Sequence, residues 1–222
     1  MTTLRLTASD GHELGGWLAT PQGTPRGGIV VVQEIFGVNS HIRSICDRLA
    51  SEGYLALAPA IFDRIERDFE CGYSPEEIAV ARGFIPRFDM EGCLRDVDAA
   101  RARVSEAGKV GIVGFCLGGS VAYGAAARLD GFSGASSFYG GMVNKLVSQP
   151  ATCPMQFHYG ADDTGIPPEN YEAVRAACPE AEFYVYENAG HGFNCDQRAS
   201  YAPEAAALAW SRTLDFLART IG

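Results

Sequence analysis

The segment Val110–Tyr123, with the sequence VGIVGFCLGGSVAY, constrains the possible fold more than any other part of this chain. Its apolar start, Val110–Val113, is typical of a buried strand, and the residues after the glycine-rich turn have helical character. A residue at so sharp a strand-to-helix turn often has strained backbone angles, and small neighbours make room for it. That residue is Cys116, so the sequence predicts a thiol held at the exit of a buried strand.

Residues 114–118, GFCLG, fit the Gly-x-nucleophile-x-Gly pattern of a nucleophile elbow, with cysteine in place of the usual serine. The first amides of the following helix, and the positive end of its dipole, would stabilise a thiolate and an oxyanion beside it. The alternative is a tight turn around a buried structural cysteine, because a motif this short also arises by chance.

Apolar runs and helical patterns alternate along the chain, which predicts an α/β fold with a mostly parallel, doubly wound sheet and helices on both faces. The runs Leu4–Thr7 and Leu14–Ala19 flank an Asp-Gly turn, so we expect an antiparallel hairpin at one edge. No linker or internal repeat divides the sequence, and residues 1–222 are expected to form a single domain. Further strands are expected at 28–33, 54–58, 109–113, 134–138, 155–159 and 182–186, and helices at 40–52, from Ser74 onward, and at 89–107, 117–128, 169–177 and 202–218.

The chain of 222 residues has 18 basic and 27 acidic residues, a net charge of −9, which argues against nucleic acid or an anionic membrane as a partner. No apolar run approaches the ~18 residues of a membrane span, and the first residues lack a signal peptide's apolar core, so a cytoplasmic location is expected. The seven cysteines are odd in number and include no Cys-x-x-Cys pair. They indicate neither a disulfide framework nor a zinc site, and we expect no metal or cofactor.

Cys116, Asp163 and His191 each follow a predicted strand, in the order nucleophile, acid, histidine. In such a triad the sulfur attacks an acyl carbon to form a thioester, the histidine transfers protons, and the aspartate orients the imidazole. Asp163 is preferred to Asp162, which could cap the loop, although the order alone leaves both open. His158 lies inside an apolar strand and is expected to be structural.

Glu34 directly follows the predicted strand 28–33, at the end where α/β sheets bind their ligands. A carboxylate after so apolar a run is costly unless it has a partner, which favours a catalytic role over capping of the helix 40–52. The oxyanion hole would be built from backbone amides, those of Leu117 after the nucleophile and Ile35 after the strand.

With these features the sequence resembles the dienelactone hydrolase (carboxymethylenebutenolidase) family of the α/β-hydrolase fold. The similarity spans nearly the whole chain, in the segments 33–39 (QEIFGVN), 114–119 (GFCLGG), 139–140 (YG), 160–167 (GADDTGIP) and 190–193 (GHGF). The resemblance implies Asp163 as the acid, and places Phe36 and Tyr139 beside the substrate. It also implies a gating or base role for Glu34: in the family the resting thiol is thought to be neutral, bonded to the matching glutamate, and to swing toward the histidine on substrate binding.

Two positions depart from the family pattern. Members that open dienelactones hold the substrate carboxylate with arginines, and the matching positions here are Ile78 and Cys195. Arg82 or Arg198 could substitute, whereas neither isoleucine nor cysteine can form a bidentate pair with a carboxylate. The reaction therefore transfers from the family more directly than the substrate does, and we expect hydrolysis of lactones or small carboxylic esters.

Two other functions stand as alternatives. The chain could be a broad-specificity carboxylesterase without an anchor for anionic substrates, or a non-catalytic redox-sensing protein in which Cys195 resolves oxidised Cys116. A thiol protease is the weakest alternative, because nothing in the sequence indicates a peptide-binding edge. A small-molecule ester or lactone is the expected partner, and a monomer the expected state, with a dimer as the alternative.

Overall fold

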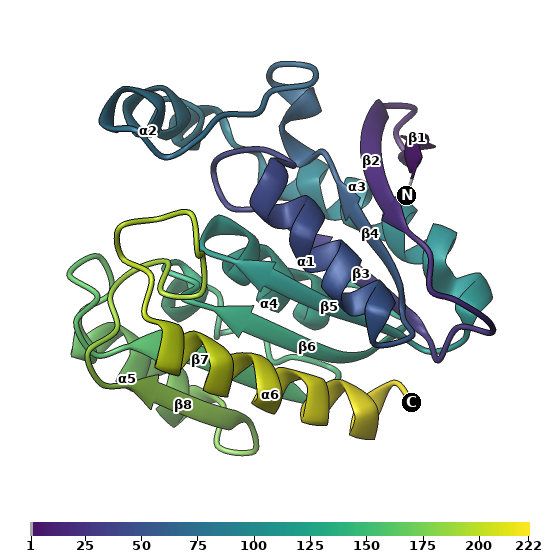
Figure 1. Cartoon of the computed structure of the whole chain (residues 1–222). Coiled ribbons are helices and arrows are strands. Elements are labelled where there is room, and N and C mark those ends of the chain that lie inside the picture. Colours follow the sequence, from purple (N-terminus) through teal and green to yellow (C-terminus); the bar gives the residue numbers. More distant parts are fainter. Residues whose placement is uncertain (1) are drawn as a thin grey trace.

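Eight strands form one sheet, in the order β1-β2-β4-β3-β5-β6-β7-β8, in a computed structural model that describes residues 2–222 (Figure 1). Strand β2 pairs antiparallel with both β1 and β4, and the remaining neighbours are parallel. The strands are β1 (Thr2–Thr7), β2 (Glu13–Ala19), β3 (Gly28–Val32), β4 (Leu55–Pro59), β5 (Val110–Phe115), β6 (Phe132–Phe138), β7 (Met155–Gly160) and β8 (Glu182–Tyr186).

The central strands β3, β4 and β5 are buried along their whole length. Because both faces of a doubly wound sheet are covered by helices, such strands read as continuous apolar runs rather than as alternating patterns. At the edge, β1 and β2 form the predicted hairpin, and Gly11 in its turn has a φ of +83°. The predicted sheet and its antiparallel edge are confirmed.

Helices cover the sheet on both faces (Figure 1). On one face α1 packs on β2, β3 and β4, and α6 packs on β6 and β7; on the other, α3 packs on β3 and β4, and α4 on β5 and β6. The α-helices are α1 (Ser40–Ser51), α2 (Pro75–Arg82), α3 (Met90–Val104), α4 (Leu117–Arg128), α5 (Pro168–Ala177) and α6 (Pro203–Thr220). Short 3₁₀ turns are η1 (Ile61–Arg64), η2 (Ile85–Arg87), η3 (Ser105–Ala107) and η4 (Val143–Lys145).

The long connection from β4 to α3 carries α2, which stands apart from both helical layers (Figure 1). Its predicted start is confirmed by a capping box, in which Ser74 and Glu77 each accept the other's backbone amide. The helix predicted at 89–107 is shorter, because the α-helix ends at Val104 and η3 completes the turn.

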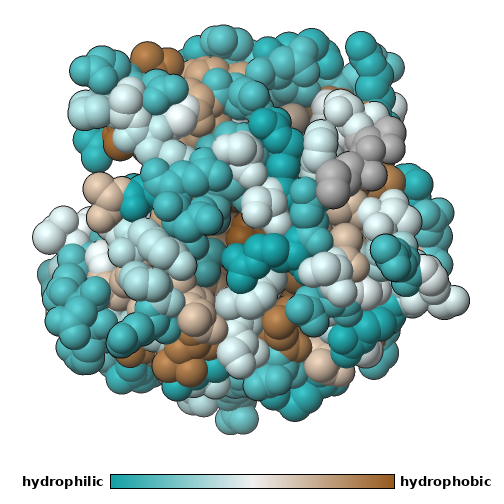
Figure 2. Space-filling view, viewed as in Figure 1, coloured by the Kyte–Doolittle hydropathy of each residue, from teal (hydrophilic) through white to brown (hydrophobic). Residues whose placement is uncertain are grey.

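None of the helices in residues 2–222 combines the length and the apolar character that a membrane span requires. The surface in Figure 2 is mostly hydrophilic, and its apolar patches are small and separated. Large apolar side chains that are exposed include Val80 and Ile85, on and after α2.

Candidate active site

Cys116 occupies the turn between β5 and α4 with φ +55° and ψ −114°, outside the conformations that most residues adopt. The turn is tight because α4 packs directly on the strands. A Cβ atom at Gly114 would lie 1.9 Å from the Gly118 carbonyl oxygen, and one at Gly118 would lie 2.3 Å from that of Val32. Both glycines are therefore required sterically, and the strained turn predicted for Cys116 is present.

The structure brings Cys116, His191 and Asp163 together. His191 Nε2 lies 3.1 Å from Cys116 Sγ, and His191 Nδ1 lies 2.7 Å from Asp163 Oδ2. The other Asp163 oxygen accepts the Gly165 amide at 2.8 Å, and Ser200 Oγ donates to the His191 carbonyl at 2.7 Å. The carboxylate is thus held through both oxygens and the imidazole through both ring nitrogens, whereas among residues 2–222 no hydrogen bond joins Asp162 to the histidine side chain.

Burial acts to lower the pKa of His191, but the Cys116 sulfur and the Asp163 carboxylate outweigh it and raise that pKa to about 10. A carboxylate hydrogen-bonded to an imidazole favours the protonated form of the imidazole. A histidine in this position can hold a proton at neutral pH and give it to a leaving group.

Leu117 and Ile35 are the two residues whose backbone amides the sequence predicts as the oxyanion hole. Leu117 is the first residue of α4, so its amide has no acceptor one turn earlier in the helix. Ile35 lies in the loop after β3 and lines the same cavity as Cys116 and His191. Within residues 2–222, neither amide donates a hydrogen bond to another backbone group.

The cavity above Cys116 has a volume of about 310 Å³. Its apolar wall combines the β3 loop, through Ile35 and Phe36, with the α2 segment, through Ile78 and Ile85. Its polar lining residues are Arg82, Thr164, His191 and Arg198. A pocket of this kind, mostly apolar with a few convergent polar groups, is typical of a small-molecule site.

The sequence profile of the dienelactone hydrolase family matches residues 14–221. A Synechocystis protein provisionally named carboxymethylenebutenolidase is 36% identical over 231 residues, covering 95% of this chain and 94% of its own. The carboxymethylenebutenolidase of Pseudomonas putida is 34% identical over 226 residues, covering 97% and 95%. The chain belongs to the dienelactone hydrolase family. It is accordingly a hydrolase that acts on ester or lactone substrates.

The fold agrees with this membership. A crystal structure from Klebsiella pneumoniae, provisionally named a dienelactone hydrolase, has a TM-score of 0.86 and 31% identity. The match covers 99% of this chain and 100% of the Klebsiella chain. The likeness therefore extends over nearly the whole of both chains.

Glu34 is 1% exposed, but its partners differ from those that dienelactone hydrolases led us to expect. Tyr73 Oη donates to Oε2 at 3.1 Å, and Arg198 Nη1 donates to Oε1 at 2.9 Å. No hydrogen bond in the described residues joins Glu34 to Cys116, and the thiol faces His191. The expected resting contact between thiol and glutamate is wrong for this structure, because Arg198 and Tyr73 occupy both carboxylate oxygens.

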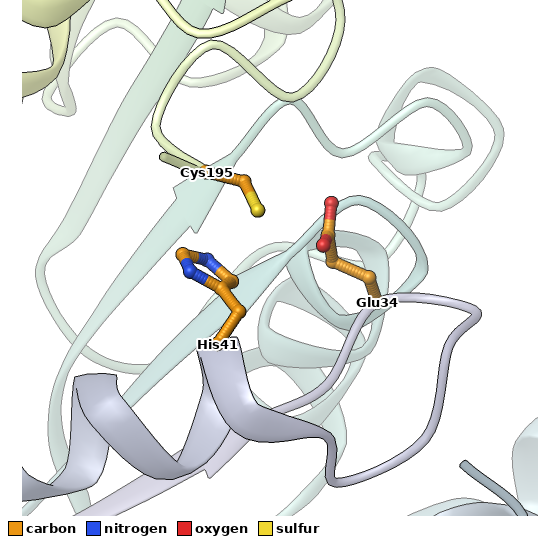
Figure 3. Close-up of side chains that lie close together, drawn as sticks. All are labelled: Glu34, His41 and Cys195. Atoms are coloured by element: carbon orange, nitrogen blue, oxygen red, sulfur yellow. The ribbon is translucent and has the colours of Figure 1, made fainter. Parts of the chain in front are cut away.

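Glu34, His41 and Cys195 form a buried cluster whose oxygen, nitrogen and sulfur atoms all lie within 4.8 Å of one another (Figure 3). Burial, together with the Glu34 charge, raises the pKa of Cys195 to about 11, and burial lowers that of His41. Both are therefore neutral at pH 7. Because the Arg198 guanidinium already pairs with Glu34, the cluster suits an ion pair within the protein better than an added cation.

The residues expected beside the substrate fall into two groups. Phe36 and Arg82 line the cavity. Tyr139 is fully buried and does not line it; its ring lies 5.2 Å from that of His191. The reason is that the Tyr139 amide extends the pairing of β6 with β7, donating to the His158 carbonyl at 2.7 Å, so the side chain enters the core.

Sequence reasoning missed Tyr73 and Thr164 and gave no partner for Arg198. Each lies in a loop without periodic pattern, and only the Gly-rich context of 160–167 could have drawn attention to Thr164.

A larger hollow of about 500 Å³ lies elsewhere, between residues 150–155 and 177–181. It contains two thiols but no histidine, so the smaller cavity over Cys116 is the candidate active site.

Proposed function

We propose that this dienelactone hydrolase family member hydrolyses lactones or small carboxylic esters through a thioester on Cys116. The observation that carries the proposal is the contact of Cys116 Sγ with His191 Nε2, at 3.1 Å, on the floor of the cavity. A nucleophile, a base within hydrogen-bond reach and a third group that orients the base are the elements of acyl transfer.

The reaction has two halves. First, the Cys116 sulfur gives its proton to His191 Nε2 and forms a carbon–sulfur bond with the acyl carbon, while the Leu117 and Ile35 amides stabilise the developing oxyanion. The tetrahedral adduct then expels the alkoxide, which takes the proton from His191 Nε2. In the second half His191 removes a proton from water, whose oxygen attacks the thioester and releases the acid and the thiol. The Asp163 carboxylate holds the imidazole throughout.

One observation favours a second form of this activity, a carboxylesterase for neutral substrates. Ile78 lines the cavity at the position where family members that open dienelactones have an arginine, and the positive charge of Arg198 is neutralised by Glu34. Within residues 2–222, Arg82 is the one cavity arginine without a carboxylate partner. We propose that Arg82 determines whether the enzyme accepts only neutral esters or also substrates that carry a carboxylate, because its exposed guanidinium at the cavity can pair with such a carboxylate.

The test is hydrolysis of a dienelactone carboxylate and of its neutral methyl ester by the full chain, with Cys116→Ala as the inactive control. Turnover of at least one substrate by the wild type, and of neither by the variant, supports the proposal. Turnover that survives in Cys116→Ala would contradict it. A folded wild type that hydrolyses neither these nor simple aryl esters, but forms a disulfide on peroxide treatment, would favour the redox-sensing alternative.

A further inference from the structure

The loop between β8 and α6, residues 187–202, borders two cavities. His191 and Arg198 of this loop line the candidate active site. A second pocket, of about 280 Å³, lies between the same loop, the last turn of α1 and the first turns of α6. Within the described chain the two cavities share no lining residue. The second pocket is lined by Arg48, Asn194, Asp196, Tyr201, Ala206 and Ala207.

Arg48 presents a fixed cation to the second pocket. Its guanidinium carbon lies 3.8 Å from the ring centroid of Trp210, a buried residue of α6, and this stacking holds the planar group in place. Within residues 2–222, no carboxylate oxygen lies within 4.0 Å of its guanidinium nitrogens. An arginine that is held in place without an anionic partner can bind a ligand carboxylate through two parallel hydrogen bonds.

Asp196 places a negative charge at the same pocket. Burial lowers the pKa of Arg48, and the Asp196 carboxylate is the first of the charges that oppose this shift, so it lies near enough to act on the guanidinium. The basic nitrogen closest to Asp196 in the described residues is His41 Nδ1, at 3.7 Å. Burial lowers the pKa of His41, which is neutral at pH 7. Arg48 and Asp196 therefore border one pocket as opposite charges that do not pair with each other.

Asn194 adds a hydrogen-bond donor that the protein leaves unused. The residue is only 4% exposed, and its side-chain nitrogen has no hydrogen-bond partner among residues 2–222. An unpaired buried amide costs stability, so nearly all such groups in native proteins have a partner. A ligand carboxylate in this pocket supplies the acceptor that the amide lacks.

We propose that the second pocket is a binding site for a small zwitterion that carries a carboxylate and an ammonium group, of which a free amino acid is the simplest. Arg48 and Asn194 hold the carboxylate, and Asp196 holds the ammonium group. A simple anion would be repelled by Asp196 and a simple cation by Arg48, so a ligand with both charges is favoured. The volume lies just below the ~300–1,000 Å³ typical of ligand sites, which limits the occupant to a small molecule.

The experiment is a chemical-shift titration of the ¹⁵N-labelled full chain with L-alanine, L-leucine and L-phenylalanine, which sample three side-chain sizes. We expect at least one of them to bind with a Kd below about 1 mM and to shift the amides of residues 194–201. Its N-acetyl form, without the ammonium charge, and its amide, without the carboxylate, should each bind at least about tenfold more weakly. A Kd above about 1 mM for all three amino acids would overturn the inference. No ester is present, so the result does not depend on the proposed hydrolysis.

Two variants assign the two ends of the ligand. Arg48→Met should raise the Kd of the amino acid at least about tenfold and leave the Kd of its amide, which has no carboxylate, within about twofold. Asp196→Asn should raise the Kd of the amino acid by a similar factor and leave the Kd of its N-acetyl form within about twofold. A change in pocket shape alone would not separate the two analogues in this way. An amino-acid Kd that is unchanged in Arg48→Met would overturn the inference.

Two further arginines serve as controls. Arg212 also stacks on an aromatic ring, 4.0 Å from the centroid of Tyr184, but does not line the pocket, and Arg212→Met should leave the Kd within about twofold. Arg82→Met, at the active-site cavity, should have as little effect. Binding lost in Arg82→Met and kept in Arg48→Met would place the ligand in the active site and overturn the inference. If Arg48→Met does not fold, Asp196→Asn decides, because that side chain is 68% exposed: a Kd equal to that of the wild type would overturn the inference.

Discussion

Two histidines on neighbouring parts of the sheet show how the partners of an imidazole determine whether it can act in catalysis or stabilises the fold. His191, in the loop after β8, lies between a sulfur and a carboxylate, which outweigh burial and raise its pKa to about 10. His158, inside β7, is fully buried, and burial, aided by the Arg212 charge, lowers its pKa to about 3. The difference lies in the partners, since a buried histidine without a carboxylate beside it stays neutral.

The partners of His158 are all neutral. Its Nδ1 lies 2.8 Å from Tyr186 Oη, and its Nε2 lies 2.8 Å from Gln156 Oε1 and 3.1 Å from Thr213 Oγ1. Thr213 belongs to α6, so this network joins the sheet to the helix that covers it. We infer that His158 stabilises the fold and His191 performs chemistry, and the predictions below test that division.

The largest expected effect is on His191. His191→Ala should lower kcat/KM for ester hydrolysis by about 10⁴-fold or more, because proton transfer to and from the sulfur is lost. His158→Gln should change kcat/KM by less than about threefold. Both changes in kcat/KM are measured by steady-state kinetics with the same aryl ester. Comparable losses in the two variants would remove the distinction between these histidines.

The next effect concerns the nucleophile. Cys116→Ser should keep the fold and lose about 10³-fold in kcat, because a serine hydroxyl is far weaker as a nucleophile unless its base is arranged for it. Circular dichroism and thermal unfolding check the fold, and initial rates check the loss. Full activity in this variant would contradict a thiolate mechanism.

A pH effect on stability is expected from His158. In the unfolded chain its imidazole takes up a proton below pH ~6.5, whereas in the folded protein it does so only near pH 3. The unfolded state thus binds more protons in this range, so the free energy of unfolding should fall by about 1.4 kcal/mol per pH unit as the pH drops below 6.5. Urea unfolding at pH 7.5, 5.5 and 4.5 measures the slope. In His158→Gln the slope of the unfolding free energy against pH should be smaller by about 1.4 kcal/mol per pH unit. Equal slopes in the wild type and the variant would show that His158 is charged in the folded state.

The smallest expected effect is on substrate preference. Arg82→Met should raise KM about tenfold for an ester that carries a carboxylate and leave KM for its neutral counterpart within about twofold. Arg87→Met, an arginine of the same connection that does not line the cavity, serves as the control. Equal changes for both esters would mean that the cavity has no anionic anchor at Arg82.

Local pattern was enough to predict the strands, the helices and the elbow, because each is encoded by residues close together in the chain. The order of Cys116, Asp163 and His191 predicted their meeting, since parallel strands bring their carboxyl ends to one edge of the sheet. The salt bridge of Glu34 with Arg198 joins positions 164 residues apart, through two loops without periodicity. No local signal carries such a contact, and the burial of Tyr139 and the position of the Glu34 carboxylate away from the thiol were not predictable for the same reason.

The most direct test of the central claim is mass spectrometry of the full chain trapped with a slowly hydrolysed aryl ester at low pH. The account predicts an added acyl mass on the peptide that contains Cys116, which hydroxylamine removes, and no such mass in His191→Ala over the same time. An acyl group on any other residue, or turnover without a covalent adduct in rapid-quench samples, would contradict it.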